Sequence, residues 1–352
     1  MSEQKAAVPF ELDEHKKELF KGAVDLHIHT DPSFMQRTAD AISCASEAAS
    51  VGMRAVCYKD HHLGTVQEAW LANKYYKRID TPFAKTETPF TAYGSYCMNN
   101  SQGGYDPYTL ETALRFGAKQ IYGPTVSSGN QHPMEHTAAQ GKDAGSFMPM
   151  KLKPISEFEL SVYENGVDGE VSSRLKDCLA LIRDYDVIFS TGHLSYDDSY
   201  AVVKVAKEMG CKKLLLTHFD VLRTSLTYTE PYTKRSLEEL GEVQKAGDCF
   251  VEYCISNKLY GLHAKDANPY HEVPDEYRSA CLRYFGPDLI VHGTDNGSSF
   301  YPRIVEEYAL IFDDLIKFGF SDADIRKMTS TNACALLGIS VTEQDIIPGI
   351  ND

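Results

Sequence analysis

Short apolar runs alternate with amphipathic segments along most of the chain. Eight runs have the length and residue types of buried strands, near residues 23–28, 54–59, 90–95, 119–124, 186–191, 212–217, 249–254 and 288–294. Helical patterns fill most of the gaps, at 38–52, 65–79, 106–117, 199–210 and 233–247. This alternation predicts βα units around a parallel sheet, and eight units predict a closed (β/α)8 TIM-type barrel. The first strand is not followed by a G-x-G-x-x-G turn, which disfavours an open dinucleotide-binding sheet.

The pattern predicts one barrel domain at residues 22–340, with an N-terminal extension at 1–21 and a C-terminal tail at 341–352. Two longer stretches interrupt the alternation of predicted strands and helices, at 125–172 after the fourth strand and at 255–275 after the seventh. Both follow the C-terminal ends of strands, where barrels of this type build their sites. We therefore interpret them as substrate loops, with a subunit contact as the alternative.

The composition is that of an ordinary folded protein, 43% hydrophobic and 24% charged. The net charge of −15 is spread along the chain without a basic cluster, which disfavours nucleic acid or an anionic membrane as partner and favours a small-molecule substrate. No apolar run approaches the ~18 residues of a membrane span, and the polar N-terminus does not read as a secretion signal, so we expect a soluble cytoplasmic protein. Nine cysteines without a C-x-x-C pair predict scattered buried thiols.

The stretch "VDLHIHTDPS", residues 24–33, carries the first chemical signal. Side chains alternate along an extended strand, so His27 and His29 are expected to point one way while Leu26 and Ile28 point the other. Two such imidazoles can simply be core histidines. A metal site needs three or four ligands from distant segments, so the deciding question is how the other strands end.

Four other strands end in similar side chains. Strand two runs into "YKDHH", which contains Lys59 and His61, and strands five, six and eight run into His193, His218 and Asp295. Closing a barrel brings these ends together, so we predict a centre for one or two divalent metal ions there. Nitrogen and oxygen ligands suit zinc, our leading expectation, and also manganese, iron or nickel.

This arrangement resembles the amidohydrolase superfamily, in which His-x-His follows strand one, His follows strands five and six, and Asp follows strand eight of a distorted (β/α)8 barrel. The segment "TSTNACALLGI", residues 329–339, is also similar to the closing segment of that superfamily, although Ala333 and Cys334 stand where Pro-Ala is usual. The stretches "VCYKDHH" and "TGHLS" most resemble a little-described group of metal-dependent hydrolases within it.

The resemblance implies that His27, His29 and Asp295 hold a first ion and that His193 and His218 hold a second. In one-metal members the strand-five histidine joins the first site, and the strand-six histidine contacts substrate or water instead. Both versions remain open at the level of the sequence.

Four further residues are expected at the same site. Two-metal members usually carry a carboxylated lysine after strand four, where this chain has none; Lys59 is expected either to take that bridging role or to bind an anionic substrate. His61 shares the inward side with Lys59, and we expect it to orient substrate, replace a ligand or form a hydrogen bond behind the ligands. Arg37 is a candidate for pairing with a substrate carboxylate, and Tyr96 for contacting a substrate ring.

The implied activity is hydrolysis of an amide, cyclic amide, lactone or related C–N or C–O bond of a small molecule by metal-activated water. Asp295 would act as general base and then acid, and His218 or His193 would help to stabilise the developing oxyanion. The alternatives are a metal-dependent decarboxylase on the same barrel, a phosphoesterase, and a catalytically silent metal-binding barrel. The resemblance also implies a homo-oligomer.

Overall fold

The computed structural model describes seven stretches of the chain, residues 12–81, 88–131, 159–166, 169–218, 236–255, 274–298 and 301–350. Within them lies an eight-stranded sheet in which each strand pairs in parallel with the next along the chain. The strands are β1 Val24–Ile28, β2 Ala55–Tyr58, β3 Thr91–Cys97, β4 Gln120–Tyr122, β5 Ile188–Ser190, β6 Leu214–Leu216, β7 Phe250–Cys254 and β8 Ile290–Gly293. The predicted (β/α)8 barrel is confirmed, and every strand overlaps its predicted range.

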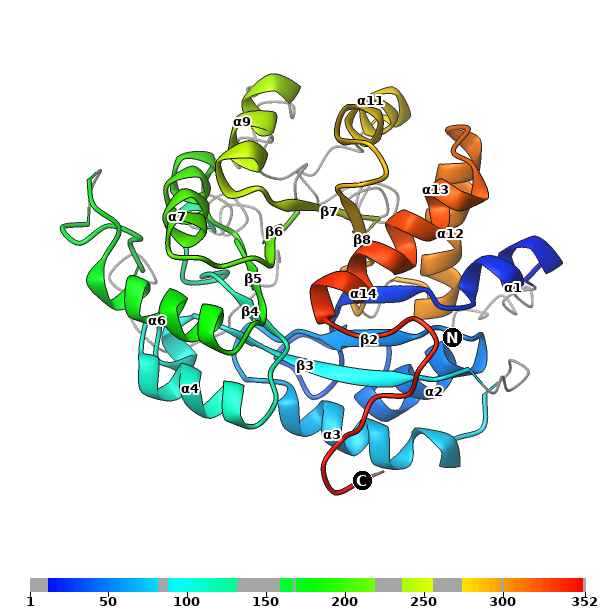
Figure 1. Ribbon diagram of the computed structural model, residues 1–352. Helices are drawn as coiled ribbons and strands as arrows, with labels where there is room; N and C mark the ends of the chain where they lie inside the picture. Colours follow the sequence, from blue (N-terminus) through cyan, green and yellow to red (C-terminus); the bar gives the residue numbers. More distant parts are fainter. Residues whose placement is uncertain are drawn as a thin grey trace, which may run out of the picture.

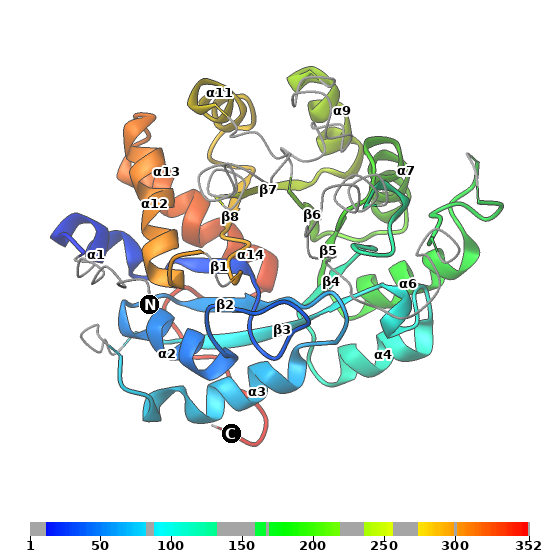
Figure 2. The same ribbon diagram turned by 180° about the vertical axis from the view of Figure 1, so that it is seen from behind.

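Helices surround the strands on all sides (Figure 1). Figure 2 shows α2, α3 and α4 along one side of the barrel, with α9 and α11 on the opposite side. The described α-helices are α1 Glu14–Phe20, α2 Ala41–Ser50, α3 Val66–Tyr75, α4 Pro107–Arg115, α6 Ser173–Asp184, α7 Tyr196–Glu208, α9 Leu237–Gly247, α11 Asp275–Phe285, α12 Ile304–Lys317, α13 Asp322–Arg326 and α14 Asn332–Leu337. Side-chain caps set several of their starts; Asp40, for example, accepts hydrogen bonds from the first free N–H groups of α2.

The apolar core has two layers, one inside the barrel and one between the strands and the helices. The outer layer is the larger and joins alternate strand residues to the buried faces of the helices. The segment that resembles the amidohydrolase closing motif forms α14, which packs against β1 and β8 and fills one end of the barrel (Figure 1). The inner layer consists of Val24, Leu26, Ala55, Cys57, Tyr93, Ile188, Leu215, Val291, Ala333, Cys334, Leu336 and Leu337.

The side-chain alternation predicted for β1 is interrupted. Leu26 packs in the inner layer together with Val24, although strict alternation would place it opposite His27. The register of β1 against β2 shifts between Asp25 and Ile28, where three steps along β1 match two along β2. Leu26 packs in the inner layer but Ile28 packs in the outer layer, so the prediction that these two side chains share one face was wrong.

The barrel closes between β1 and β8 just where both strands end. The backbone N–H of Asp295 donates to the carbonyl of His27 at 2.8 Å, and the N–H of His29 donates to the carbonyl of Asn296 at 2.7 Å. The buried carboxylate of Asp25 accepts hydrogen bonds from the hydroxyl of Thr294 at 2.6 Å and from the backbone N–H of His27 at 3.0 Å. This seam fixes the relative positions of His27, His29 and Asp295 before any ligand binds.

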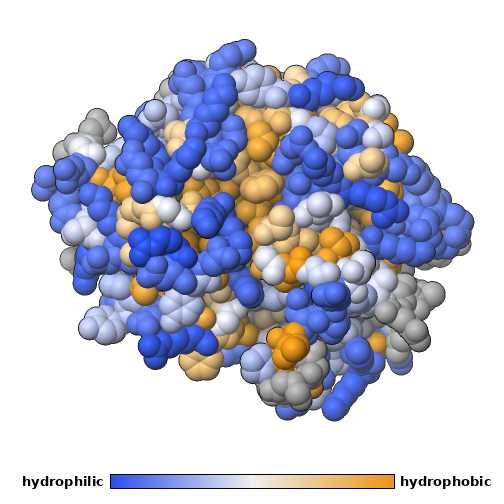
Figure 3. Space-filling view, in the orientation of Figure 1, coloured by the Kyte–Doolittle hydropathy of each residue, from blue (hydrophilic) through white to orange (hydrophobic). Residues whose placement is uncertain are grey.

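Most of the two predicted substrate loops, residues 132–158 and 256–273, lie outside the described residues. Among the described helices, none is long and apolar enough to cross a membrane. The face in Figure 3 is largely hydrophilic at its edges, with hydrophobic side chains showing nearer its middle.

Candidate metal centre

Five imidazoles from four regions of the chain meet at the C-terminal ends of the strands. Going round, the distances between ring centroids are 5.5 Å from His27 to His29, 4.9 Å from His29 to His61, 5.5 Å from His61 to His193, 5.3 Å from His193 to His218, and 4.9 Å from His218 back to His27. We call these five side chains the five-histidine cluster. The structure thus brings together all five histidines that the strand ends singled out.

The carboxylate of Asp295 contacts two histidines of the five-histidine cluster. Its Oδ1 lies 3.0 Å from Nε2 of His27 and 3.2 Å from Nε2 of His29. Ligand atoms bound tetrahedrally at about 2.0–2.1 Å from one ion lie about 3.3–3.4 Å apart, so both distances from Oδ1 are close to the spacing that a zinc-type ion needs. All three atoms lie within 4.8 Å of one another. With 21% of its side chain exposed, Asp295 also remains accessible from outside the barrel.

Backbone strain marks the two residues that turn inward from β6 and β8. His218 has φ of +48° and Asp295 has φ of +54°, in the left-handed region that side chains with a Cβ seldom adopt. Such conformations persist only where the surroundings enforce them, and they cluster at functional sites.

His218 fits the role of a metal ligand. Its Nδ1 lies 3.7 Å from Oδ2 of Asp295, and its Nε2 is buried without a hydrogen-bond partner among the described residues. Burial lowers the pKa of His218 to about 4, so the ring is neutral at neutral pH and keeps a lone pair for an ion. An unpartnered buried nitrogen is costly unless something binds it, and a cation satisfies that need.

Lys59 lies beside the first ligand set. Its side chain is 1% exposed, with Nζ 2.9 Å from Nε2 of His27 and 4.8 Å from the ring centroid of Tyr122. No carboxylate in the described part of the chain forms an ion pair with it within 4.0 Å. An ammonium there competes directly with a cation for the His27 lone pair.

Glu252 is a member of the site that the sequence reasoning missed. Both of its oxygens face Nδ1 of His27, at 3.2 and 3.3 Å, and Oε2 also accepts the backbone N–H of His218 at 3.3 Å. A Cβ at position 293 would lie 3.1 Å from Oε1 of Glu252 and 2.9 Å from Cβ of His27, so Gly293 leaves room for this contact. The available signal was an acidic residue inside the apolar run "CFVEYC", on the same face as Cys254.

The carboxylates of the site are held in their ionised forms. Burial opposes this for Glu252, but the facing His27 imidazole outweighs it and lowers the pKa of Glu252. Burial likewise opposes the charge on Asp295, yet His27 and His218 hold the pKa of Asp295 well below its usual value. For His27, burial and Lys59 lower the pKa, but Asp295 and Glu252 outweigh them and the net shift is upward.

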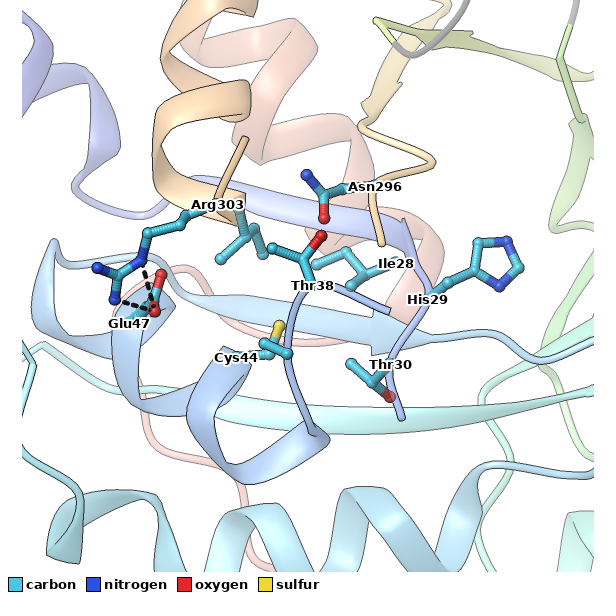
Figure 4. A pocket seen from close by; sticks show the side chains of 10 residues that line it. Ile28, His29, Thr30, Thr38, Cys44, Glu47, Asn296 and Arg303 are labelled. Carbon is cyan, nitrogen blue, oxygen red and sulfur yellow. Dashed lines mark hydrogen bonds and ion pairs between the residues drawn. The ribbon is translucent and has the colours of Figure 1, made fainter. Parts of the chain in front are cut away.

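Arg37 lies at the edge of the site, whereas Tyr96 does not reach it. Nη2 of Arg37 is 3.3 Å from Nδ1 of His29. Figure 4 shows the small pocket beside β1, lined in part by the Glu47–Arg303 ion pair; the ring of His29 points away from that pair.

The structure corrects the prediction that Tyr96 contacts substrate. Its ring belongs to the outer layer of the core, and its hydroxyl donates to the carbonyl of Gln102. Alternation along β3 explains this, because Tyr96 shares its face with Ala92, which also packs in the outer layer.

Comparison with known proteins supports this reading of the fold. Residues 22–240, more than half of the chain, match a family described as "Family of unknown function (DUF6282)". The chain belongs to that family. No curated protein matches it.

Its fold is shared with an amidohydrolase from Pseudomonas aeruginosa, with a TM-score of 0.54 and 13% identity over 93% of this chain and 98% of that one. The probable dipeptidase PvdM from Pseudomonas aeruginosa is also similar, with a TM-score of 0.51 and 14% identity over 92% and 97% of the two chains.

At these identities the likeness concerns the fold, and it confirms the expected resemblance to amidohydrolases at that level. In this member of DUF6282, the matched region contains all five histidines of the five-histidine cluster and Lys59. Glu252 and Asp295 lie beyond its end at residue 240.

Proposed function

We propose that this protein is a metal-dependent hydrolase that cleaves an amide, cyclic amide, lactone or related C–N or C–O bond of a small molecule. The observation that carries the proposal is the convergence of Nε2 of His27, Nε2 of His29 and Oδ1 of Asp295 at the five-histidine cluster. These residues would hold a first divalent ion, and His193 and His218 a second. Zinc suits this nitrogen and oxygen donor set, as do manganese, iron and nickel.

When bound, the ion would polarise a carbonyl oxygen and lower the pKa of water toward 7. The residues of the chain supply the remaining steps. Asp295 is ionised, and its Oδ2 faces His218 at 3.7 Å rather than the His27 and His29 pair. That oxygen is the one placed to accept a proton from water and then to deliver it to the leaving atom.

Lys59 has two possible roles in this proposal, and they differ in charge. As an ammonium it would bind an anionic group of the substrate, but it would also oppose a cation at His27, from which it is 2.9 Å away. As a carboxylated lysine it would carry a negative charge and bridge two ions. Its burial favours the second role in a metal-loaded protein, because a buried cation beside a dication is strongly disfavoured.

The test begins with elemental analysis of protein purified without added metal, followed by chelation and reconstitution. Turnover is then measured on a panel of amides, cyclic amides and lactones, with Asp295→Asn as the inactive comparison. Metal binding with turnover that chelation abolishes supports the proposal. Release of CO2 without hydrolysis would establish the decarboxylase instead, and tight metal binding without any turnover would favour a silent barrel.

A further inference from the structure

A buried hydrogen-bond chain behind His61 determines which of its nitrogens carries the proton. The chain starts at Asn99, which is fully buried. Oδ1 of Asn99 accepts two backbone N–H groups, from Thr125 at 2.8 Å and Ser127 at 3.1 Å, and these donors fix the orientation of the amide. Its Nδ2 therefore donates both hydrogens, to the carbonyl of His61 at 2.8 Å and to Oγ1 of Thr125 at 2.6 Å.

The hydroxyl of Thr125 is the next step in the chain. It receives a hydrogen from Asn99, so its own hydrogen needs an acceptor, and Thr125 is fully buried. Among the described residues its one remaining partner is Nδ1 of His61, at 2.9 Å. The hydroxyl therefore donates to Nδ1, and the single hydrogen of the neutral imidazole resides on Nε2.

His27 has the opposite arrangement. Its Nδ1 faces the carboxylate of Glu252, which only accepts, so Nδ1 carries a hydrogen. Its Nε2 lies 2.9 Å from Nζ of Lys59 and 3.0 Å from Oδ1 of Asp295, so it is the nitrogen left for a metal once it has released any second proton.

A ligand in the position of His61 would need its lone pair on Nε2, because Thr125 already occupies Nδ1. A donor at Nδ1 does not exclude a ligand by itself, since Nη2 of Arg37 lies 3.3 Å from Nδ1 of His29. The difference is that His29 belongs to a group of potential ligand atoms within 4.8 Å of one another, with His27 and Asp295, whereas His61 belongs to no such group among the described residues.

We propose that His61 does not bind the metal and instead presents a neutral Nε2–H group to an oxygen atom of the substrate. The group it would bind is a carbonyl or carboxylate oxygen, which is a hydrogen-bond acceptor, and the inference rests on the proposed function. In the five-histidine cluster His61 lies next to His29, a ligand of the first predicted ion, and next to His193, a ligand of the second. His61 is 8% exposed, and a donor in a buried site stabilises negative charge that develops on such an oxygen.

The proton positions are measured directly in metal-free protein, labelled with 15N in its histidines, at neutral pH. Two-bond hydrogen–nitrogen correlation spectra distinguish the two neutral tautomers, and His61→Gln and His27→Gln identify the two spin systems. The expected result is a protonated Nε2 for His61 and a protonated Nδ1 for His27. A protonated Nδ1 on His61 overturns the proposal, and this reading needs no metal and no substrate.

Matched variants at Thr125 test the cause. Thr125→Ser keeps the hydroxyl and should keep the His61 spectrum, whereas Thr125→Val removes the donor and should shift His61 toward the other tautomer. An unchanged spectrum in a folded Thr125→Val protein overturns the assigned hydrogen-bond chain.

Zinc affinity separates a donor from a ligand. His61→Gln should bind zinc with wild-type stoichiometry and within about threefold of wild-type affinity, whereas His27→Gln, which removes a ligand, should weaken zinc binding by more than the 10–100-fold typical of lost supporting contacts. A loss of tenfold or more in His61→Gln makes it a ligand and overturns the proposal. If wild-type protein binds no divalent metal, the proposed function fails, and the tautomer spectrum still decides the assignment of His61.

Discussion

Replacing Glu252 by Gln should weaken metal binding without unfolding the barrel. The substitution keeps the shape of the side chain and removes one buried negative charge. Glu252 now accepts from Nδ1 of His27 at 3.2 Å and from the backbone N–H of His218 at 3.3 Å, and the pKa of its carboxyl is lowered. The amide oxygen can still accept from one of these donors, but without the assistance of the charge.

The size of the effect follows from the two contacts. A hydrogen bond to a charged group contributes about 1.5–3 kcal/mol and a neutral one about 0.5–1.5 kcal/mol, so the His27 contact loses roughly 1–1.5 kcal/mol. Because 1.4 kcal/mol is a factor of ten, this contact alone predicts about tenfold weaker zinc binding. Loosening His218 extends the expected range to about 10–100-fold, the usual result of removing a carboxylate behind a metal-bound histidine.

The assay is competition for zinc against a chromophoric chelator, with the melting temperature of the metal-free proteins as a check on folding. Glu307→Gln is the matched control, because Glu307 is also fully buried and hydrogen-bonded, to Asn296. Burial raises the pKa of Glu307 well above its usual value, which favours the neutral carboxyl, so the change to an amide disturbs less charge there than at Glu252. Zinc binding in Glu252→Gln as tight as in wild type would refute the positioning role.

Four further outcomes are expected. Asp295→Asn should abolish turnover while its circular dichroism stays that of wild type, because the amide cannot accept the proton from water; residual activity near the wild-type level would exclude Asp295 as the base. Zinc at a hundredfold excess over its Kd should stabilise the folded protein by about 2.7 kcal/mol, seen as a higher melting temperature that chelation reverses. Burial lowers the pKa of His292 from 6.5 to about 3, so only the unfolded chain gains this proton, and stability is lost as the pH falls from 6.5 toward 3, by at most about 1.4 kcal/mol per pH unit from this residue. Urea unfolding at about pH 7 and about pH 5 should show a smaller loss in His292→Leu than in wild type, and equal losses would contradict the shift. If Lys59 is carboxylated, zinc-loaded protein prepared in 13C-bicarbonate should show a carbamate 13C resonance that Lys59→Gln lacks.

The strand ends were readable from the sequence because each is a local pattern. An apolar run followed by His, Lys or Asp identifies both the strand and the side chain that leaves it, and barrel closure then brings those side chains together. Alternation also places Lys59 on the inner face with Cys57, as the structure does. The same rule, applied to the interior of β7, would have identified Glu252, which shares its face with Phe250 and Cys254.

Two predictions were wrong, for Leu26 and for Tyr96. The first failed because β1 departs from regular alternation, and the second because Tyr96 is close in sequence to the site but lies on the other face of its strand. The register shift in β1 separates Leu26, which packs inside the barrel with Val24, from Ile28, which packs outside it, and nothing local in the run "VDLHI" indicates that shift. Tyr96 lies within β3, one residue beyond the predicted end of that strand, and its side chain packs in the outer layer of the core.

The sequence by itself determined the fold class and the residue types that gather at the mouth of the barrel, because both follow from periodicities within short segments. The tertiary structure decided what each imidazole can do. Glu252 is 225 residues from His27, and Thr125 is 64 residues from His61, yet these partners set the protons of the two rings in opposite positions. The hydrogen bond at one nitrogen of a histidine helps to determine whether the other nitrogen offers a lone pair or an N–H group, and only the folded chain supplies that bond.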